Sequence, residues 1–530
     1  MAAENTSTAA FLTTEQSRQA DKWLVAASVL MGTFLSVMDV SVVNVAMPHM
    51  MGSFGQDLLT ITWVSTAYSI AEIIMITMTA FWSTLLGRKR LFLASMTVFI
   101  VGSILAGTSR TFGQMLFYRV LQGAGGGTLI PASQAIVREK FPPSEQAMAM
   151  AIYGMGVMLA PTLGPVIGGW LVDNWGWRWI FFVNVPFAVV GILMVSAFVQ
   201  DPPYLKRGIE RIDWIGIALL AVGLTALQIV LERGQEVDWF SSPAIVAGTA
   251  SAVLALAVLM VWELTLEEPV INFRLLRDLR LSAGSGMGAV LGFALFGSTF
   301  LLPELTQEVL GYPAFRAGLV LLPRAVAIFL IMPIAGRLYN YASPRILVGF
   351  GMTLLAIAYW GLGHFTLGVG FWNFVPLLVE TGVGVGCSTV ILSTVSLSSM
   401  PPESMTEAAG LYTLVRRVSA NIAYAVLATL VERHSQLHRA ELVGNVNSLG
   451  TSFYQYESRA NARLMSRGYN SVTWRKRDIA IVNGVLNRQS TMMAYNDVFT
   501  LLSWFFVFAL PLILLLPKEG IPPEVVTPTE

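Results

Sequence analysis

The chain has 530 residues, of which 55% are hydrophobic and only 12% charged, and its formal net charge at pH 7 is +1. Soluble domains carry roughly twice this share of charge, so the composition predicts a membrane protein, and the near-neutral balance argues against a nucleic-acid partner. The single cysteine, Cys387, excludes an internal disulfide and a multi-cysteine metal site.

Apolar runs of about 20 residues, the length that crosses a bilayer, recur along the chain. They predict an all-α integral membrane protein with fourteen transmembrane helices, near residues 23–47, 59–81, 91–109, 113–136, 147–172, 177–198, 212–232, 243–265, 282–304, 316–338, 346–366, 373–399, 408–432 and 492–516. The first 22 residues are polar and the first apolar run is long, which predicts an uncleaved first helix rather than a secretory signal.

Cationic side chains mark one side of this predicted bundle. With a cytoplasmic N-terminus, the inner loops contain Arg88, Lys89, Arg90, Arg138, Lys140, Lys206, Arg207, Arg211, Arg274, Arg277, Arg280, Arg337 and Arg345. The short outer loops contain only Arg110, Arg178, Arg233 and Arg316. Because short cytoplasmic loops are enriched in Lys and Arg, the bias predicts that both termini are cytoplasmic.

The stretch 433–491 is too long for this rule and is predicted to be a polar loop on the outer side. It contains His434 and His438, which are four residues apart and could share one helix face. In a polar, arginine-rich loop, solvated side chains are favoured over metal ligands. No metal site is therefore expected.

Two loop segments indicate an internal repeat. Residues 79–90 read TAFWSTLLGRKR and residues 334–345 read IAGRLYNYASPR. Both place a small residue at an apolar helix end, followed by a turn and arginine, as in transporters built from parallel six-helix repeats. The predicted domains are a tail 1–22, a bundle 23–200, a linker with an inserted helix pair 201–275, a second bundle 276–516 and a tail 517–530.

The helix near 147–172 is crowded with glycine and proline. Gly164, Gly168 and Gly169 remove side chains and let neighbouring backbones approach. Pro165 interrupts the backbone ladder, which lipid cannot repair, so other helices must surround it. This pattern predicts a helix that packs very closely or bends.

Two ionisable residues lie inside predicted spans at similar depth. Asp39 precedes the outer end of the first span by nine residues, and Arg119 is about as far from the outer end of the fourth. At 1.5 Å per residue, both lie roughly 10–13 Å below the outer surface and could interact. A carboxylate whose charge is favoured by arginine and disfavoured by burial could load and release a proton. The alternative for Arg119 is a structural clamp on backbone carbonyls.

Other charged side chains in the spans lack a partner nearby in the sequence. Glu72 and Glu380 could bind protons, attract cationic substrates in a cavity, or be protonated packing residues. Arg416 and Arg417 interrupt the thirteenth span, so one of them could face the cavity while the other pairs or reaches the interface.

Several motifs give the chain a specific resemblance. They are MDVSVVNVAMP in the first span, RVLQGAGGGTLIPAS in the fourth, and APTLGPVIGGWLVDNWGWRWIFFVNVP across the fifth and sixth. The chain resembles the EmrB-like fourteen-helix drug–proton antiporters of the major facilitator superfamily from about residue 22 to 516. The resemblance implies two six-helix bundles that rock around a central cavity.

The same resemblance implies functional positions. Asp39 and Arg119 match family-wide functional positions, and Gly164-Pro165 matches the antiporter signature. From their places in the spans, Asp39 and Arg119 are the first candidates for proton coupling, and Glu72 and Glu380 are further ones. Residues that would line or gate the cavity are Asn44, Gln122, Gly123, Gly164, Pro165, Gly168, Gly169 and Arg416. The family commonly has aspartate at the position of Thr84 and glycine at that of Ala80, so the inward gate is expected to be weaker or differently built.

These features predict a secondary transporter in the inner membrane that exports lipophilic or multidrug substrates against proton entry, with no cofactor. The resemblance implies an EmrA-type periplasmic adaptor and a TolC-type outer-membrane channel as partners, with adaptor contact at 433–491. The alternative is an exporter of one endogenous metabolite, such as a siderophore, lipid or fatty acid. A membrane enzyme or receptor would need a catalytic constellation or soluble domain, and the sequence shows neither.

Overall fold

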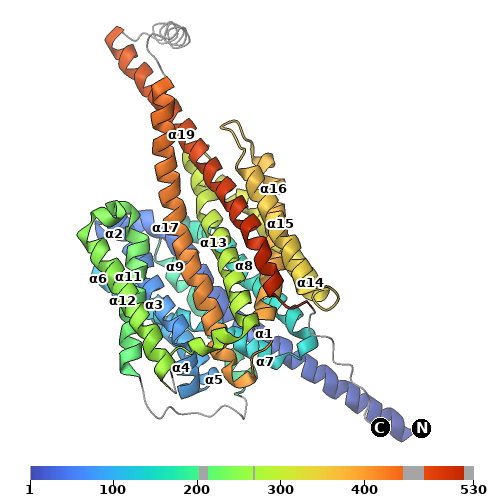
Figure 1. Cartoon of the computed structure of the whole chain (residues 1–530). Coiled ribbons are helices and arrows are strands. Elements are labelled where there is room, and N and C mark those ends of the chain that lie inside the picture. The colour runs from blue at the N-terminus through green and yellow to red at the C-terminus, as the bar shows by residue number, and fades with distance from the viewer. Residues whose placement is uncertain (1, 202–212, 267–268, 446–470, 519–530) are drawn as a thin grey trace.

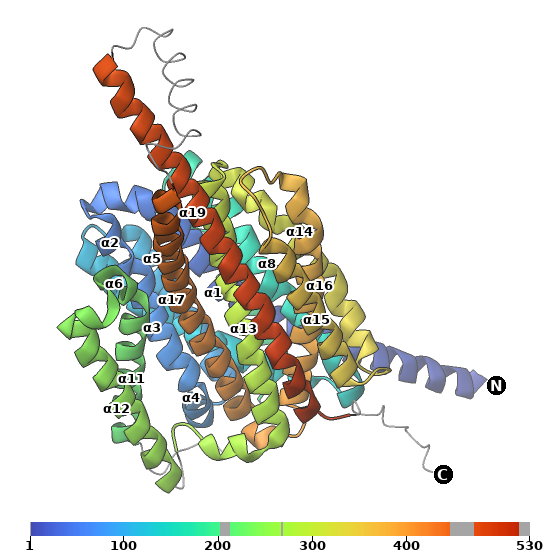
Figure 2. The ribbon, with the colours of Figure 1, turned by 45° about the horizontal axis from the view of Figure 1, so that its top comes forward.

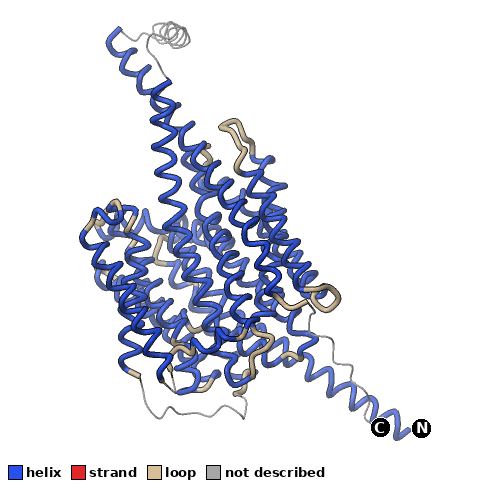
Figure 3. Tube along the Cα trace, viewed as in Figure 1, coloured by secondary structure: helices blue, strands red, loops and turns tan. Residues whose placement is uncertain are grey.

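The computed structural model describes residues 2–201, 213–266, 269–445 and 471–518, and every regular element within them is a helix (Figure 3). Twelve helices are long and apolar enough to cross a membrane, and α3 and α4 together form a thirteenth crossing with a 59° bend. The remaining predicted crossing, near 113–136, falls on α6 and α7, which meet at Thr128. The chain is a helical multi-pass membrane protein.

The helices form two bundles with an inserted pair beside them (Figure 1). The N-terminal bundle consists of α1 (Ala2–Phe54), α2 (Leu58–Ile61), α3 (Trp63–Thr77), α4 (Thr79–Leu86), α5 (Arg88–Thr108), α6 (Phe112–Gly127), α7 (Leu129–Lys140), α8 (Pro143–Trp175), α9 (Trp179–Phe182) and α10 (Asn184–Phe198). The inserted pair is α11 (Trp214–Arg233) and α12 (Pro243–Thr265), joined by short helices at Gln235–Val237 and Trp239–Ser241. The predicted inner-loop residues Lys206, Arg207 and Arg211 lie outside the described residues.

The C-terminal bundle begins after a short 3₁₀ turn at Phe273–Arg277. It consists of α13 (Leu279–Glu304), a π-helical turn at Leu305–Val309, α14 (Ala314–Leu338), α15 (Pro344–Leu362), α16 (Phe371–Ser396), a turn at Pro402–Ser404, α17 (Met405–Asn445), α19 (Ser471–Ala509) and a final turn at Leu510–Leu515. Each bundle has its own apolar core, and a third cluster joins α3, α7 and α17 to the inserted pair.

One helix in each bundle carries glycine at alternate positions and packs against two neighbours. These glycines are Gly123, Gly125 and Gly127 of α6 and Gly382, Gly384 and Gly386 of α16. A Cβ atom on Gly123 would lie 2.3 Å from a backbone oxygen of α3, and one on Gly382 would lie 2.5 Å from a backbone oxygen of α14. The same packing thus occurs at corresponding places in the two bundles, as a parallel repeat requires.

The middle glycine of each set contacts the third helix of its own bundle. A Cβ atom on Gly125 would lie 2.4 Å from the backbone nitrogen of Phe99 in α5, and one on Gly384 would lie 2.6 Å from the carbonyl oxygen of Gly351 in α15. Apolar burial does not drive helices together in lipid, so association depends on such close backbone approach.

The segment 433–491, predicted to be a polar loop, is helical in its described parts. Both α17 and α19 extend as helices beyond the other helices of the bundle, side by side (Figures 1 and 2). The reason is that helix-forming residues such as Glu, Arg, Gln and Leu continue past the apolar run, and only hydrophobicity ends at 432. Residues 446–470 lie outside the described residues. His434 and His438 are also not merely solvated, because both contact Asp497 of α19.

The segment 79–90, predicted to be a loop, is also mostly helical. The helices α4 and α5 are separated by Gly87 alone, whose φ of 84° is unfavourable for residues with a Cβ atom. The turn therefore places Arg88 directly at the start of α5, where it can point back into the bundle.

We predict that Gly125→Val destabilises the protein by about 1–3 kcal/mol, because the added side chain would overlap the backbone of α5. The measurement is the midpoint of thermal unfolding of the purified protein in detergent. Gly113→Val, in the same helix but with no atom within 4 Å of its Cβ position, is the control. Equal midpoints for the two variants would contradict the packing role of Gly125.

Candidate transport site and its contacts between the bundles

Asp39 of α1 is bound by three side chains within the apolar N-terminal bundle. Arg119 donates to its Oδ2 at 2.6 Å, and Gln122 and Asn184 donate to its Oδ1 at 2.8 and 3.0 Å. Arg119 also donates to Gln122 Oε1 at 2.7 Å. All four side chains are at most 1% exposed. The predicted ion pair is therefore present, and the partners of Asp39 come from α6 and α10.

Arg119 holds more than the carboxylate. Its Nε donates to the carbonyl oxygen of Val64 at 3.0 Å, and its guanidinium lies 4.4 Å from the ring centroid of Tyr68. Both interpretations from the sequence, an ion pair and a clamp on a backbone carbonyl, therefore apply at once. Its Nη2 has no hydrogen-bond partner among the described residues. Arg119 thus ties α3 to the same centre as Asp39.

Sequence reasoning did not single out Asn184 as part of this centre. It begins α10, is 1% exposed, and donates to Ser103 Oγ at 3.2 Å as well as to Asp39. The available signal was its position as a polar residue inside the apolar run FFVNVP, because such residues in a membrane helix usually face a partner. Its Oδ1 accepts no hydrogen bond among the described residues.

Two other residues predicted to line the cavity, Asn44 and Gly123, are not bound to Asp39. Asn44 is exposed, and its Oδ1 accepts a hydrogen bond from Ser65 at 3.1 Å. Gly123 packs against the carbonyl oxygen of Tyr68, so its main structural contribution is the approach of α6 to α3. Of the predicted set, Gln122 is the residue that joins Asp39 and Arg119 directly.

Glu72 has a partner that the sequence did not reveal. It lies in α3, is 2% exposed, and forms an ion pair with Arg417 of α17, which is in the other bundle. Glu380 of α16 is separate from this pair, and its Oε2 is buried without a hydrogen-bond partner among the described residues. The two glutamates therefore do not form one site.

Arg416, next to Arg417, has its charge uncompensated by any carboxylate in the part of the chain that the structure describes. Its guanidinium lies 5.5 Å from the ring centroid of Tyr412, and its Nε is buried with no acceptor there. Its side chain is partly exposed and packs beside Gly288 of α13. A buried donor without a partner is costly, which makes Arg416 a candidate contact for a bound ligand.

The glycine-rich helix α8 divides its contacts between the bundles. A Cβ atom on Gly164 would lie 1.9 Å from Ser41 Oγ of α1, and one on Gly168 would lie 3.1 Å from Val42 of α1. Nothing lies within 4 Å of the Cβ position of Gly169, and Pro165 is exposed. The predicted close packing is thus present at Gly164 and Gly168, but it joins helices of the same bundle.

The contact of α8 with the other bundle lies nearer its start. A Cβ atom on Gly336 of α14 would lie 2.9 Å from the carbonyl oxygen of Ala147, and one on Gly154 would lie 3.1 Å from Met332. One helix therefore packs on α1 through one half and on α14 through the other.

Arginines join the two bundles at the end that carries the basic loops. Arg88 forms an ion pair with Glu139 and donates to Thr406 Oγ1 at 2.9 Å and to the carbonyl oxygen of Pro402 at 2.8 Å. Arg138 donates to the carbonyl oxygen of Thr394 at 2.8 Å. The acceptors that these two arginines find in the other bundle are a hydroxyl group and backbone carbonyl oxygens, whereas the Arg88–Glu139 ion pair lies within the N-terminal bundle.

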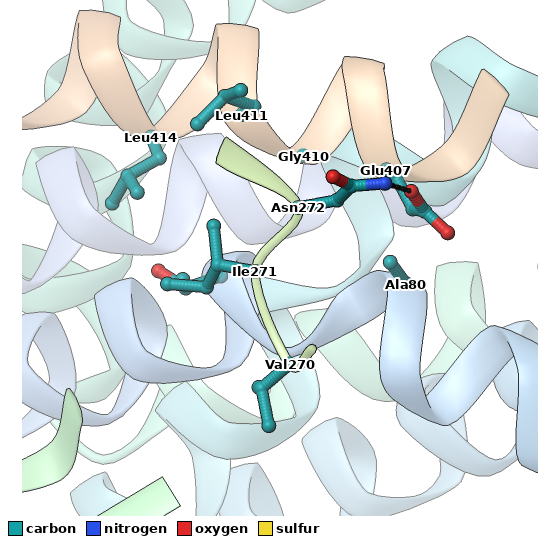
Figure 4. Close-up of a pocket in the computed structure, with 9 residues that line it drawn as sticks. Ala80, Val270, Ile271, Asn272, Glu407, Gly410, Leu411 and Leu414 are labelled. Carbon is teal, nitrogen blue, oxygen red and sulfur yellow. Dashed lines mark hydrogen bonds between the residues drawn. The ribbon is translucent and has the colours of Figure 1, made fainter. Parts of the chain in front are cut away.

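Thr84 donates to the carbonyl oxygen of Ala80 in its own helix at 3.1 Å. Ala80 instead lines a small pocket between α4, α17 and the segment that leads to α13 (Figure 4). In this pocket Asn272 donates to Glu407 Oε2 at 3.1 Å. The chain segment after the inserted pair thereby helps to close the same end of the molecule.

Comparison with known proteins agrees with this architecture. The family model described as Major Facilitator Superfamily matches residues 29–424. The multidrug export protein EmrB of Escherichia coli K12 is 33% identical over 488 residues, covering 91% of this chain and 93% of that protein. The fatty acid resistance protein FarB of Neisseria gonorrhoeae is 29% identical over 494 residues, covering 92% and 95%.

Solved structures agree on the fold. The human organic anion transporter MFSD10 superposes with a TM-score of 0.60 at 17% sequence identity, over 92% of this chain and 99% of that chain. At this identity the comparison concerns the arrangement of helices only.

We predict that Gly164→Ala lowers transport severalfold while the Asp39–Arg119 pair remains intact, because its Cβ would overlap Ser41 and push α8 from α1. The measurement is drug efflux from cells that contain equal amounts of each variant. Gly169→Ala, which adds the same methyl group to open space, should transport normally. Ser41→Ala should partly rescue Gly164→Ala, and an absence of rescue would contradict this steric explanation.

Proposed function

The chain belongs to the Major Facilitator Superfamily and is a membrane transporter, and we propose that it exports lipophilic drugs in exchange for protons. The names of its relatives, which describe multidrug export, support the substrate class. The observation that carries the proton coupling is the fully buried Asp39, held by three donors at the centre of the N-terminal bundle.

Protonation of Asp39 would change several contacts at once. A neutral carboxyl group no longer has the charge that binds Arg119. Its new O–H group also needs a hydrogen-bond acceptor, whereas the side chains around the ionised carboxylate all act as donors to it. Gln122 can rotate its amide to accept, and Arg119 keeps its bond to Val64 O. The helices α1, α6 and α10 would then be less firmly joined, so one proton can alter their relative positions.

The packing of α8 offers a route from this centre to the other bundle. Ser41 lies two residues after Asp39 on α1 and contacts Gly164, while the opposite half of α8 contacts α14. A displacement of α1 would therefore move α8 against α14. A helix that contacts both bundles in this way is consistent with transport in which the two bundles tilt around a central site.

Glu72 and Arg417 supply a direct ionic contact between the bundles. Loss of the charge on Glu72, by protonation or by competition from a cationic substrate, would leave Arg417 free to turn. We assign this pair a gating role and assign the primary proton step to Asp39.

We further propose that the protein lies in the inner membrane with both termini cytoplasmic, and that it works with an EmrA-type adaptor and a TolC-type channel. The extended α17 and α19 project from the end opposite the basic loops (Figure 1), which supports adaptor contact there. The concentration of Arg and Lys in the loops at the other end supports the proposal that this end, with both termini, faces the cytoplasm.

We predict that Asp39→Asn reduces proton-driven drug uptake into inverted membrane vesicles to the level of vesicles without the protein. Exchange of labelled for unlabelled drug, which needs no net proton movement, should persist because the helices remain folded. Asp173→Asn, at an exposed position on α8, should retain uptake. Normal gradient-driven uptake by Asp39→Asn would refute its assigned role. Vesicles from cells that co-express the adaptor, which then lies inside the vesicle, test the adaptor part of the proposal in the same assay.

A second candidate is export of an anionic amphiphile such as a fatty acid. Arg416 favours it, because this partly exposed cation has a buried Nε without an acceptor among the described residues. The relative FarB is named for fatty acid resistance. A carboxylate ligand would supply both the missing acceptor and the opposite charge.

We predict that Arg416→Gln weakens protection against long-chain fatty acids about tenfold, with little change for neutral drugs, because a charge-assisted hydrogen bond contributes roughly 1.5–3 kcal/mol. Growth inhibition of a susceptible strain measures both effects. Arg416→Lys keeps the charge and should retain part of the protection. Equal loss against neutral and anionic compounds would indicate a structural role for Arg416 instead.

A further inference from the structure

Three metal-ligating side chains meet where α17 and α19 leave the bundle. His434 Nδ1 and His438 Nε2 lie 2.8 and 2.7 Å from the same Oδ2 atom of Asp497. The ligand atoms of all three residues lie within 4.8 Å of one another. The export mechanism uses none of them, so the cluster requires its own explanation.

We propose that His434, His438 and Asp497 form a binding site for a divalent transition metal of the Zn²⁺ class, which ties the two extended helices together. Two imidazoles and one carboxylate are a ligand set that Zn²⁺ accepts, with a fourth position left for water. Carboxylate-only clusters would favour Mg²⁺ or Ca²⁺, whereas imidazole favours Zn²⁺ and its neighbours in the transition series.

The spacing of the ligands fits the proposal. His434 and His438 are four residues apart, so both project from one face of α17. Bonds of about 2.0–2.2 Å in a tetrahedron place ligand atoms about 3.3–3.6 Å apart. Each histidine nitrogen lies about 0.5–0.9 Å closer than this to the Asp497 oxygen, and side-chain rotation can open this gap to admit the ion.

A second carboxylate is placed to orient one of the histidines. The Nδ1 atom of His438 is buried without a hydrogen-bond partner among the described residues, and Glu441 Oε2 lies 3.6 Å from it. Metal-bound histidines usually donate their other ring N–H to a carboxylate or carbonyl oxygen. Coordination through Nε2 would leave Nδ1–H directed at Glu441, which accounts for the otherwise unpaired atom.

The helices on which the ligands lie are also joined by hydrogen bonds beside the cluster and farther from the membrane. Ser435 Oγ lies 3.0 Å from Thr491 Oγ1, and Arg439 donates to Asn483 Oδ1 at 3.0 Å. The ligands therefore need little ordering when the ion binds, which favours affinity. The side chain of Asp497 is 42% exposed and provides access from solvent.

The test is Zn²⁺ binding to the purified full-length protein in detergent, prepared without a histidine tag, by isothermal titration calorimetry. We expect one Zn²⁺ per chain, which a hundredfold excess of Mg²⁺ does not displace. Co²⁺ at the same site should give the visible absorption of a four-coordinate complex. No saturable Zn²⁺ binding, or Co²⁺ absorption of a purely aqueous ion, would overturn the proposal.

Substitutions locate the site. His434→Gln can still donate a hydrogen bond to Asp497 but removes a metal ligand, so it should abolish stoichiometric binding while the protein stays folded. His364→Ala removes a histidine whose Nδ1 is hydrogen-bonded to the carbonyl oxygen of Trp360, far along the chain from the cluster, and this variant should bind Zn²⁺ normally. Glu441→Gln should weaken binding about tenfold. Undiminished binding by His434→Gln and His438→Gln together would show that these residues form a hydrogen-bonded cluster and no metal site.

Discussion

A charged side chain inside a membrane bundle must face a protein partner or a water-filled cavity, because lipid offers no water to solvate it. This constraint organises the N-terminal bundle around Asp39. Its carboxylate gathers Arg119, Gln122 and Asn184 from two other helices, and Arg119 reaches the backbone of a third. The cost of leaving any of these groups unpaired fixes the positions of four helices. Our proposal that a single proton alters this cluster rests on the same dependence.

Close backbone contact is the second requirement, since apolar side chains gain little by leaving lipid for one another. Glycines of α6 and α16 meet it in corresponding ways in the two bundles. In α8 the glycines serve two different interfaces, with Gly164 against α1 and Gly154 against α14. A helix that fits tightly on both sides cannot follow a movement of one neighbour without changing its contact with the other.

The sequence predicted what depends on local pattern. Hydrophobic runs placed the membrane helices, and equal depth from the outer surface was enough to pair Asp39 with Arg119. Contacts between distant segments could not be predicted from the sequence. Glu72 and Arg417 are 345 positions apart, and no periodic pattern connects them. Asn184 was visible as a polar residue in an apolar run, but its partner was not. The extension of α17 was missed because hydrophobicity ends at the membrane surface while helix-forming residues continue.

The long helix α17 connects three groups of contacts that lie far apart in the molecule. The 41 residues of α17 span about 60 Å. Near its start Thr406 accepts a hydrogen bond from Arg88 at the end with the basic loops. In its middle Arg417 pairs with Glu72 of the other bundle, and beyond the membrane span His438 contacts Asp497. A continuous helix transmits tilt along its length, so a change at the ion pair alters both ends. Because α17 and α19 belong to the same bundle, fastening them at the histidines would stiffen their extended ends while leaving the arginine contacts to the other bundle unaltered.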